Sequence, residues 1–318
     1  AERLKTQRAR LGLTQEQTAR LLGVSSLSIW KWESGGAVPR KSLPTATNSN
    51  EEFAMSERVR LEVRDAVAYV TMTRPDKYNA LDWDMLCALV DAAETIGKDK
   101  SVRAVILQGE GKAFCSGLDF PSFTRQPARM VRGFLKYGVK TTNLFQEVAW
   151  CWRRLPVPVI AVIHGYCYGG GVQIALGADF RYTTADCEFS ILEAKWGLVP
   201  DMTGTVTLRE LLPMDQAKLL TMTGRMFSGS EARELNLVTG VSADPLAEAE
   251  KLVAEIKTRS PDAVAATKQL FHETWVAGVR RAFSKESRIQ LGLLMGKNQK
   301  IATRANFNKE APNFLPRK

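Results

Sequence analysis

Apolar and polar positions follow two different periods along the chain beyond residue 58. Short apolar runs rich in β-branched residues have the length of strands, and an unbroken run is typical of a strand buried on both faces of a sheet. Strands are predicted at residues 59–63, 67–72, 103–108 and 157–163. Amphipathic segments predict helices at residues 82–96, 119–155, 246–256 and 261–275. Strands followed by helices, repeated, indicate an α/β fold with a covered sheet.

The last of these strands leads into three consecutive glycines, residues 169–171, which open a further amphipathic segment. Glycines at a strand-to-helix junction adopt conformations that a Cβ forbids and let another group approach the backbone closely. The first N–H groups of a helix lack intrahelical partners, and the helix dipole favours negative charge beside them. The junction is therefore either a close-packed turn or a site for an oxygen that becomes anionic during a reaction.

Two carboxyl groups follow this junction in the chain. Glu193 and Asp201 both stand within mostly apolar sequence. Burying a carboxylate there is costly unless the group is paired or its pKa is raised. Both residues are therefore candidates for acid–base chemistry, which needs carboxyl groups of this kind.

The composition narrows the class of protein. The 318 residues are 45% hydrophobic and 25% charged, with a net charge of +10, as in a globular chain. No apolar run approaches the roughly 20 residues of a membrane span, and the charged N-terminus lacks a signal-peptide core. Five cysteines without CxxC spacing predict free thiols in a reducing cytoplasm rather than disulfides or zinc. Because the chain has only two histidines, we expect no histidine-rich metal site.

Residues 1–40 form a unit of their own. Three helices are predicted there, at residues 2–11, 15–22 and 25–32. The segments Leu13-Thr-Gln-Glu-Gln-Thr-Ala19 and Leu22-Gly-Val-Ser25 resemble Cro/repressor-type DNA-binding domains, in which the third helix enters the major groove. The usual further helices are lacking, and Leu27 stands where a base-reading glutamine is common. These departures favour a truncated helix-turn-helix segment over sequence-specific DNA binding, which stays a second possibility.

Residues 41–56 are rich in Pro, Ser, Thr and Asn and lack apolar periodicity, which predicts a linker. Met55 directly precedes what looks like a complete domain start. We therefore expect a separate domain at residues 57–318, with residues 1–54 as an added or fused piece.

Three motifs in this domain resemble the crotonase (enoyl-CoA hydratase/isomerase) superfamily. They are Arg74-Pro with Asn79-Ala-Leu81, Lys112-Ala-Phe-Cys-Ser-Gly-Leu-Asp119, and Pro158-Val-Ile-Ala-Val-Ile-His-Gly165 followed by the three glycines. The resemblance covers residues 58–318. It implies a spiral of ββα units at 57–255, C-terminal helices at 256–318 that build trimers or dimers of trimers, and an acyl-CoA thioester substrate. No further cofactor is implied, because coenzyme A is part of the substrate.

The resemblance also implies an oxyanion hole formed by the backbone N–H groups of Leu118 and Gly170. Two preorganised donors stabilise the charge that develops on a thioester oxygen when an α-proton is removed. The residues implied to line the substrate and its coenzyme A are Ser116, Gly117, Asp119, Phe120, Pro121, Gly171 and Gln173.

The acidic residues distinguish between reactions of the family. Hydratases carry two glutamates, at the positions of Gln173 and Glu193, which are 20 residues apart (193 − 173). Glutamine does not exchange a proton, so the activation of water by two glutamates is compromised. Dienoyl-CoA isomerases resemble the chain at Glu193 and at Asp201, although they carry an aspartate at the position of Gln173.

Our first hypothesis is therefore an isomerase in which Asp201 acts as base and Glu193 as acid. A hydratase that works through Glu193, with Gln173 positioning water, is the alternative. A third possibility is an acyl-CoA- or DNA-binding protein without catalysis. The alternative for Asp201 is that it only caps a short helix that begins near Thr203.

Overall fold

The computed structural model describes residues 51–54, 57–136 and 141–318. The predicted helix-turn-helix segment, residues 1–40, and the first part of the predicted linker lie outside the described residues.

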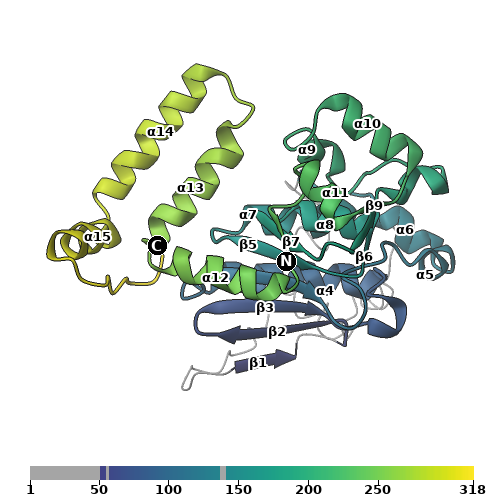
Figure 1. The fold of residues 1–318 in the computed structure, drawn as a ribbon, viewed down its shortest axis with the longest axis horizontal. Helices are drawn as coiled ribbons and strands as arrows, with labels where there is room; N and C mark the ends of the chain where they lie inside the picture. Colours follow the sequence, from purple (N-terminus) through teal and green to yellow (C-terminus); the bar gives the residue numbers. More distant parts are fainter. Residues whose placement is uncertain (1–50, 55–56, 137–140) are drawn as a thin grey trace, which may run out of the picture. The chain divides into compact units, whose positions relative to one another are not determined.

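A seven-stranded sheet forms the centre of the domain, in the order β1-β2-β3-β4-β5-β7-β10 (Figure 1). Its strands are β1 (Glu51–Ala54), β2 (Val59–Arg64), β3 (Val67–Met72), β4 (Ala104–Gly109), β5 (Val159–Ile163), β7 (Phe180–Thr183) and β10 (Gly240–Val241). The predicted hairpin is β2–β3, which is antiparallel, and β3, β4, β5, β7 and β10 run parallel. All residues of β3 and β5 are buried, as their uninterrupted apolar runs predict.

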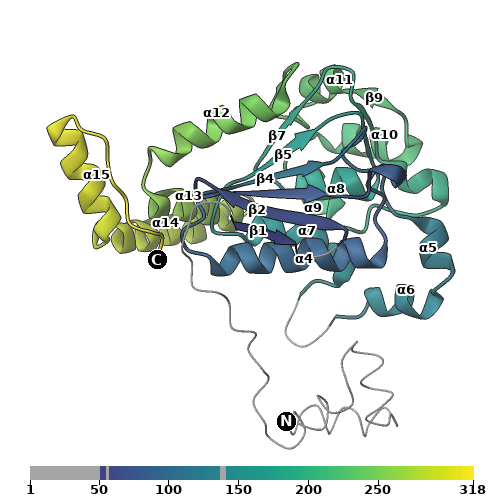
Figure 2. The same ribbon diagram turned by 90° about the horizontal axis from the view of Figure 1, so that it is seen from below.

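Helices cover both faces of this sheet (Figure 2). One face packs against α4 (Trp83–Lys98), α7 (Leu144–Arg154) and α8 (Gly170–Leu176), which together form the main hydrophobic core. The opposite face packs against α12 (Pro245–Lys257), whose Ala249 and Val253 contact side chains of β3, β4 and β5. Because β3, β4 and β5 are covered on both faces, the glycine junction after β5 sits on a rigid base.

A second, three-stranded sheet consists of β6 (Tyr166–Tyr168), β8 (Glu188–Ser190) and β9 (Phe227–Ser228). These strands are too short to show an apolar period, so they were not predicted from the sequence. The remaining helices are η1 (Pro75–Lys77), α5 (Phe120–Thr124), α6 (Pro127–Gly133), η2 (Leu192–Trp196), α9 (Gly204–Leu208), α10 (Met214–Thr223), α11 (Gly229–Glu234), α13 (Pro261–Thr274), α14 (Val279–Leu294) and α15 (Lys297–Asn308).

Three boundaries differ from the sequence prediction. The single helical region expected at 119–155 is divided into α5, α6 and α7, because Pro127 begins a new helix. Strand β1 lies inside the predicted linker 41–56, since an edge strand can form through backbone hydrogen bonds whatever its side-chain pattern. The C-terminal helical group begins at α13 rather than at residue 256, because α12 belongs to the sheet.

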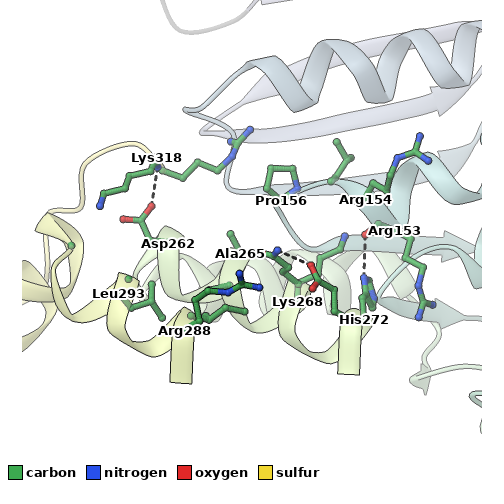
Figure 3. A pocket seen from close by; sticks show the side chains of 18 of the residues that line it. Arg153, Arg154, Pro156, Asp262, Ala265, Lys268, His272, Arg288, Leu293 and Lys318 are labelled. Carbon is green, nitrogen blue, oxygen red and sulfur yellow. Dashed lines mark hydrogen bonds between the residues drawn. The ribbon is translucent and has the colours of Figure 1, made fainter. Parts of the chain in front are cut away.

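The C-terminal helices α13, α14 and α15 form a separate group beyond the sheet (Figures 1 and 2). A cavity of about 770 Å³ lies between this group and the end of α7, and Lys268 and His272 project into it from α13 (Figure 3). The Lys268 ammonium donates to the carbonyl oxygens of Trp152 and Val157, both at 2.9 Å, and lies 2.7 Å from Asp179 Oδ2. Lys268 therefore attaches α13 to the end of α7 and the start of β5.

We expect Lys268→Met to lower the free energy of unfolding by about 3–5 kcal/mol, because it leaves the Asp179 carboxylate buried without its cation. Burial also lowers the pKa of Lys268, and the charge and hydrogen bond of Asp179 oppose that shift. The measurement is urea unfolding at constant m-value. The control is Lys251→Met on the exposed side of α12. An equal, small effect of both variants would contradict a buried attachment.

No described helix is long and apolar enough to span a bilayer. No group of three or more His, Cys, Asp or Glu side chains suited to a metal ion occurs among the described residues. All five cysteines are free thiols.

Candidate active site

The loop before α5 contains one backbone N–H group without a hydrogen-bond partner among the described residues. Leu118 forms an isolated parallel bridge with Leu81, in which Leu81 N donates to Gly117 O at 2.8 Å and Asp119 N donates to Leu81 O at 3.0 Å. Hydrogen bonds in a parallel bridge engage the residues on either side of the bridging one. The N–H of Leu118 consequently points away from Leu81, and it has no partner among the described residues.

A second free N–H group comes from the first residue of α8. Gly169 has φ = +47° and donates its N–H to Ser190 O of β8 at 2.9 Å. This turns the chain so that Gly170 begins the helix, where its N–H has no intrahelical acceptor. Within the described part of the chain the Gly170 N–H makes no other hydrogen bond.

The two segments meet at Gly117. Its φ of +92° lies in the region that favours glycine, and a Cβ there would stand 3.0 Å from Tyr168 O and 3.6 Å from Gly170 N. The N–H groups of Leu118 and Gly170 thus belong to segments in direct contact. The structure brings together the two donors that the sequence analysis names as an oxyanion hole.

Buried ion pairs hold the Leu118 loop. Arg74 lies 2.8 Å from Asp119 and 3.5 Å from Asp82, and Asp82 also pairs with Arg58. Asp119 further caps α5, accepting the N–H of Ser122. The Asp119 side chain, named from the sequence as a substrate contact, therefore makes its ion pair with Arg74 and its hydrogen bond within the loop itself.

The other predicted substrate contacts lie around this loop. The Ser116 hydroxyl donates to Lys77 O, and Pro121 is exposed in the first turn of α5. Phe120 stacks on Trp196 of η2, with ring centroids 4.6 Å apart. Gly171 packs on Cys115, where a Cβ would stand 2.7 Å from the Cys115 carbonyl oxygen.

Gln173 and Glu193 form one hydrogen-bonded pair beside the glycine turn. Gln173 Nε2 donates to Glu193 Oε1 at 2.6 Å, and its Oε1 accepts the N–H groups of Met202 and Gly204. The Glu193 carboxyl also lies against Gly169, since a Cβ there would stand 3.6 Å from Glu193 Oε1. Glu193 Oε2 is buried and has no hydrogen-bond partner among the described residues.

Burial raises the pKa of both carboxyl groups. For Glu193, burial is the main cause, the negative charge of Asp201 raises the pKa further, and the amide of Gln173 opposes the shift. For Asp201, burial raises the pKa and its own backbone N–H opposes the shift. The two groups therefore interact electrostatically.

Asp201 opens onto an apolar cavity of about 310 Å³, at the small end of the range for small-molecule sites. Leu118, which carries one of the free N–H groups, lines the same cavity. The other lining residues are Phe120, Phe123, Met130, Phe134, Phe145, Leu198 and Val199. The larger cavity at α13 is a poorer candidate for an active site. Its buried Lys268 is already hydrogen-bonded and ion-paired, and burial lowers the pKa of His272 to about 4.

Asp201 does not cap α9. The N-cap position of α9 is Thr203, and the N–H of Gly204 at the start of the helix is accepted by Gln173 Oε1 rather than by Asp201, so the capping alternative is wrong. The apolar wall formed by Phe123, Met130 and Phe145 was not predicted from the sequence. These residues come from three helices, and no spacing within the sequence indicates that they face one cavity.

The chain belongs to the enoyl-CoA hydratase/isomerase family, whose model matches residues 62–314. It is 32% identical over 259 residues to the enoyl-CoA hydratase EchA19 of Mycobacterium tuberculosis, covering 81% of this chain and 96% of that protein. It is also 30% identical to the peroxisomal Delta(3,5)-Delta(2,4)-dienoyl-CoA isomerase of Arabidopsis thaliana, covering 83% of this chain and 98% of the relative.

Among solved structures, the putative enoyl-CoA hydratase from Streptomyces coelicolor A3(2) matches with a TM-score of 0.75 and 27% identity, covering 88% of this chain and 100% of that one. The crotonase-like α/β fold predicted from the motifs is confirmed, and the chain is an enzyme of this family. A second family model, a helix-turn-helix domain, matches residues 1–44.

Proposed function

We propose that the enzyme moves a double bond along the acyl chain of an enoyl- or dienoyl-CoA, with Glu193 and Asp201 as the acid–base pair. The observation that carries this proposal is the joint placement of two carboxyl groups of raised pKa beside two free backbone N–H groups. Isomerisation needs one group to take a proton and a second group to return it at another carbon.

Electrostatics favour Asp201 as the base and Glu193 as the acid. Burial and the negative charge of Asp201 both raise the pKa of Glu193, which favours its protonated form and suits it to the role of the acid. Asp201 shares the apolar cavity with Leu118, close to where a thioester oxygen bound at the Leu118 N–H would lie.

In the proposed reaction the Asp201 carboxylate removes a proton from the carbon next to the thioester carbonyl. The electron pair delocalises onto the carbonyl oxygen, which accepts hydrogen bonds from the N–H groups of Leu118 and Gly170. Glu193 then gives its proton to the far carbon of the conjugated system, and the double bond forms nearer the thioester. A proton exchange between the two carboxyl groups or with water restores the starting charges.

The test is product analysis by NMR in D₂O with a 3,5-dienoyl-CoA and with crotonyl-CoA. We expect a 2,4-dienoyl product with deuterium incorporation, and a fall of about 10²–10⁴-fold in its rate for Asp201→Asn. Asp215→Asn on the exposed first turn of α10 is the control. If Asp201→Asn keeps the full rate, Asp201 is not the base.

Hydration is the second candidate function, because relatives of the chain are named as hydratases. In that case water adds to the enoyl-CoA double bond through Glu193 alone. The expected signature is a 3-hydroxyacyl product that disappears in Glu193→Gln and persists in Asp201→Asn.

We further propose that the C-terminal helices mediate self-association as a trimer or a dimer of trimers. Large apolar side chains are exposed on this group: Trp275, Val279, Phe283, Leu291, Leu294, Met295 and Phe307. Such surface is costly in water and is typical of an interface between subunits. Light scattering after gel filtration measures the assembly.

The remaining proposals concern the cellular location, the cofactor and DNA binding. Free thiols at all five cysteines suit a reducing cytoplasm, which is the location we propose. We propose no cofactor apart from the coenzyme A of the substrate. DNA binding through residues 1–40 is a separate hypothesis, and an affinity for duplex DNA that falls steeply with salt would support it.

A further inference from the structure

Gln173 connects three separate segments of the site. Its side chain is 1% exposed in the first half of α8. Its Oε1 accepts the N–H groups of Met202 at 2.9 Å and Gly204 at 3.0 Å. Only the carbonyl oxygen of an amide can accept two N–H groups, so these partners fix the amide orientation. The Nε2 group must then face Glu193, to which it donates at 2.6 Å.

The two N–H groups bound by Gln173 stand on either side of Thr203. Thr203 has φ = +75°, a conformation that costs a β-branched residue on the order of 1–3 kcal/mol, and its hydroxyl is buried with no partner among the described residues. Such a conformation persists only where its surroundings hold it. The approach is close: a Cβ on Gly204 would stand 2.7 Å from Gln173 Oε1. Gln173 thus holds the strained turn that directly follows Asp201.

We propose that Gln173 is a positioning residue that fixes both carboxyl groups of the reaction, an inference that rests on the proposed function. It holds Glu193 through its amide N–H and Asp201 through the turn at Met202–Gly204. Since the amide occupies Oε1 of Glu193, the buried and unpartnered Oε2 is the oxygen that transfers the proton. Both ends of the Gln173 amide are thus engaged within the protein, and the substrate contact expected from the sequence stays a prediction.

The chemistry explains why an amide suits this place. The amide donor lowers the pKa of Glu193 against the effect of burial, which eases release of the proton that Glu193 carries as the acid, whereas a second carboxyl group would oppose that release. The contacts of Glu193 from α8 and from the glycine turn are Gln173 and Gly169, neither of which titrates. Asp201 is the titrating group whose negative charge raises the pKa of Glu193. Because the amide of Gln173 does not titrate, Glu193 and Asp201 are the two titrating groups of the proposed reaction, and each has its own role.

Gln173→Glu keeps the contact with the turn at Met202–Gly204 and removes the contact with Glu193. A carboxylate oxygen still accepts the N–H groups of Met202 and Gly204, but the donor to Glu193 is lost. Two facing carboxyl groups share one proton, so we expect the pH-rate profile to move upward by about 1–3 pH units. Gln269→Glu is the matched control, because Gln269 Nε2 donates to Glu273 Oε1 at 2.7 Å in an exposed pair. The control should leave the profile unchanged.

Gln173→Met removes both contacts at similar length. We expect faster hydrogen exchange at the amides of Met202 and Gly204, together with a fall in kcat that exceeds the change in KM. Exchange at the wild-type rate would overturn the role of Gln173 in holding the turn.

A direct titration distinguishes failure of this inference from failure of the proposed function. The Glu193 carboxyl is followed by carbon NMR in free wild type and in Gln173→Glu. A higher Glu193 pKa in the variant supports positioning by Gln173 even if no isomerase activity is found. An unchanged Glu193 pKa and an unchanged pH-rate profile would overturn it.

Discussion

Glu193→Gln should reduce kcat for isomerisation by about 10²–10⁴-fold, the usual contribution of a positioned acid or base. The glutamine keeps the shape of the side chain and can still contact Gln173, but it cannot give a proton to the acyl chain. The measurement is the rate of 2,4-dienoyl-CoA formation, with Glu234→Gln on the exposed surface of α11 as control. Activity within a few-fold of wild type would exclude Glu193 as the acid.

The same substitution should stabilise the folded chain at neutral pH. Because burial raises the folded-state pKa of Glu193, its contribution to stability is fully present below the unfolded pKa of about 4 and is lost as the pH rises through the folded value. Glutamine has no ionisation to oppose burial. Glu193→Gln should therefore gain stability relative to wild type with rising pH, which urea unfolding at acid and neutral pH measures. A constant difference between the two proteins would contradict this assignment.

Gly117→Ala should reduce kcat by about 10²–10³-fold, as expected for the loss of one oxyanion donor. An alanine at φ = +92° is strained, and its Cβ would stand 3.0 Å from the Tyr168 carbonyl oxygen. Both effects move the N–H of Leu118 away from that of Gly170. The expected signature is a large fall in kcat with a smaller change in KM, because the lost contact strengthens only in the transition state.

Gly224→Ala controls for backbone strain. Gly224 also has a positive φ, +56°, but its Cβ would meet only the flexible stem of Lys195 and a backbone oxygen at 3.3 Å or more. This variant should lose stability and keep its activity per folded molecule. If both variants lose activity to the same degree, the effect of Gly117→Ala is general strain rather than displacement of the Leu118 N–H.

Local patterns in the sequence were sufficient for the parts of the fold that depend on local physics. The uninterrupted apolar runs of β3 and β5 predicted strands buried on both faces, and both are. The helix predicted at residues 82–96 is α4, which begins directly after Asp82, and the Asp82 side chain accepts the Met85 N–H. The glycines after β5 indicated a helix start with free N–H groups, because backbone freedom and helix ends follow from a few adjacent residues.

The tertiary structure alone decided which of these residues meet. Gln173, Glu193 and Met202 are separated along the chain, and only the packing of α8, η2 and α9 places one amide between them. The sequence likewise did not predict that Asp119 forms an ion pair with Arg74. Nor did it predict that Asp201 does not cap the N-terminus of α9. The sequence by itself determined the strands β2 to β5, the glycine junction and the two acidic candidates, since these depend on near neighbours. Long-range packing decided the partners, the burial and hence the pKa shifts, because those depend on residues that the chain brings together only on folding.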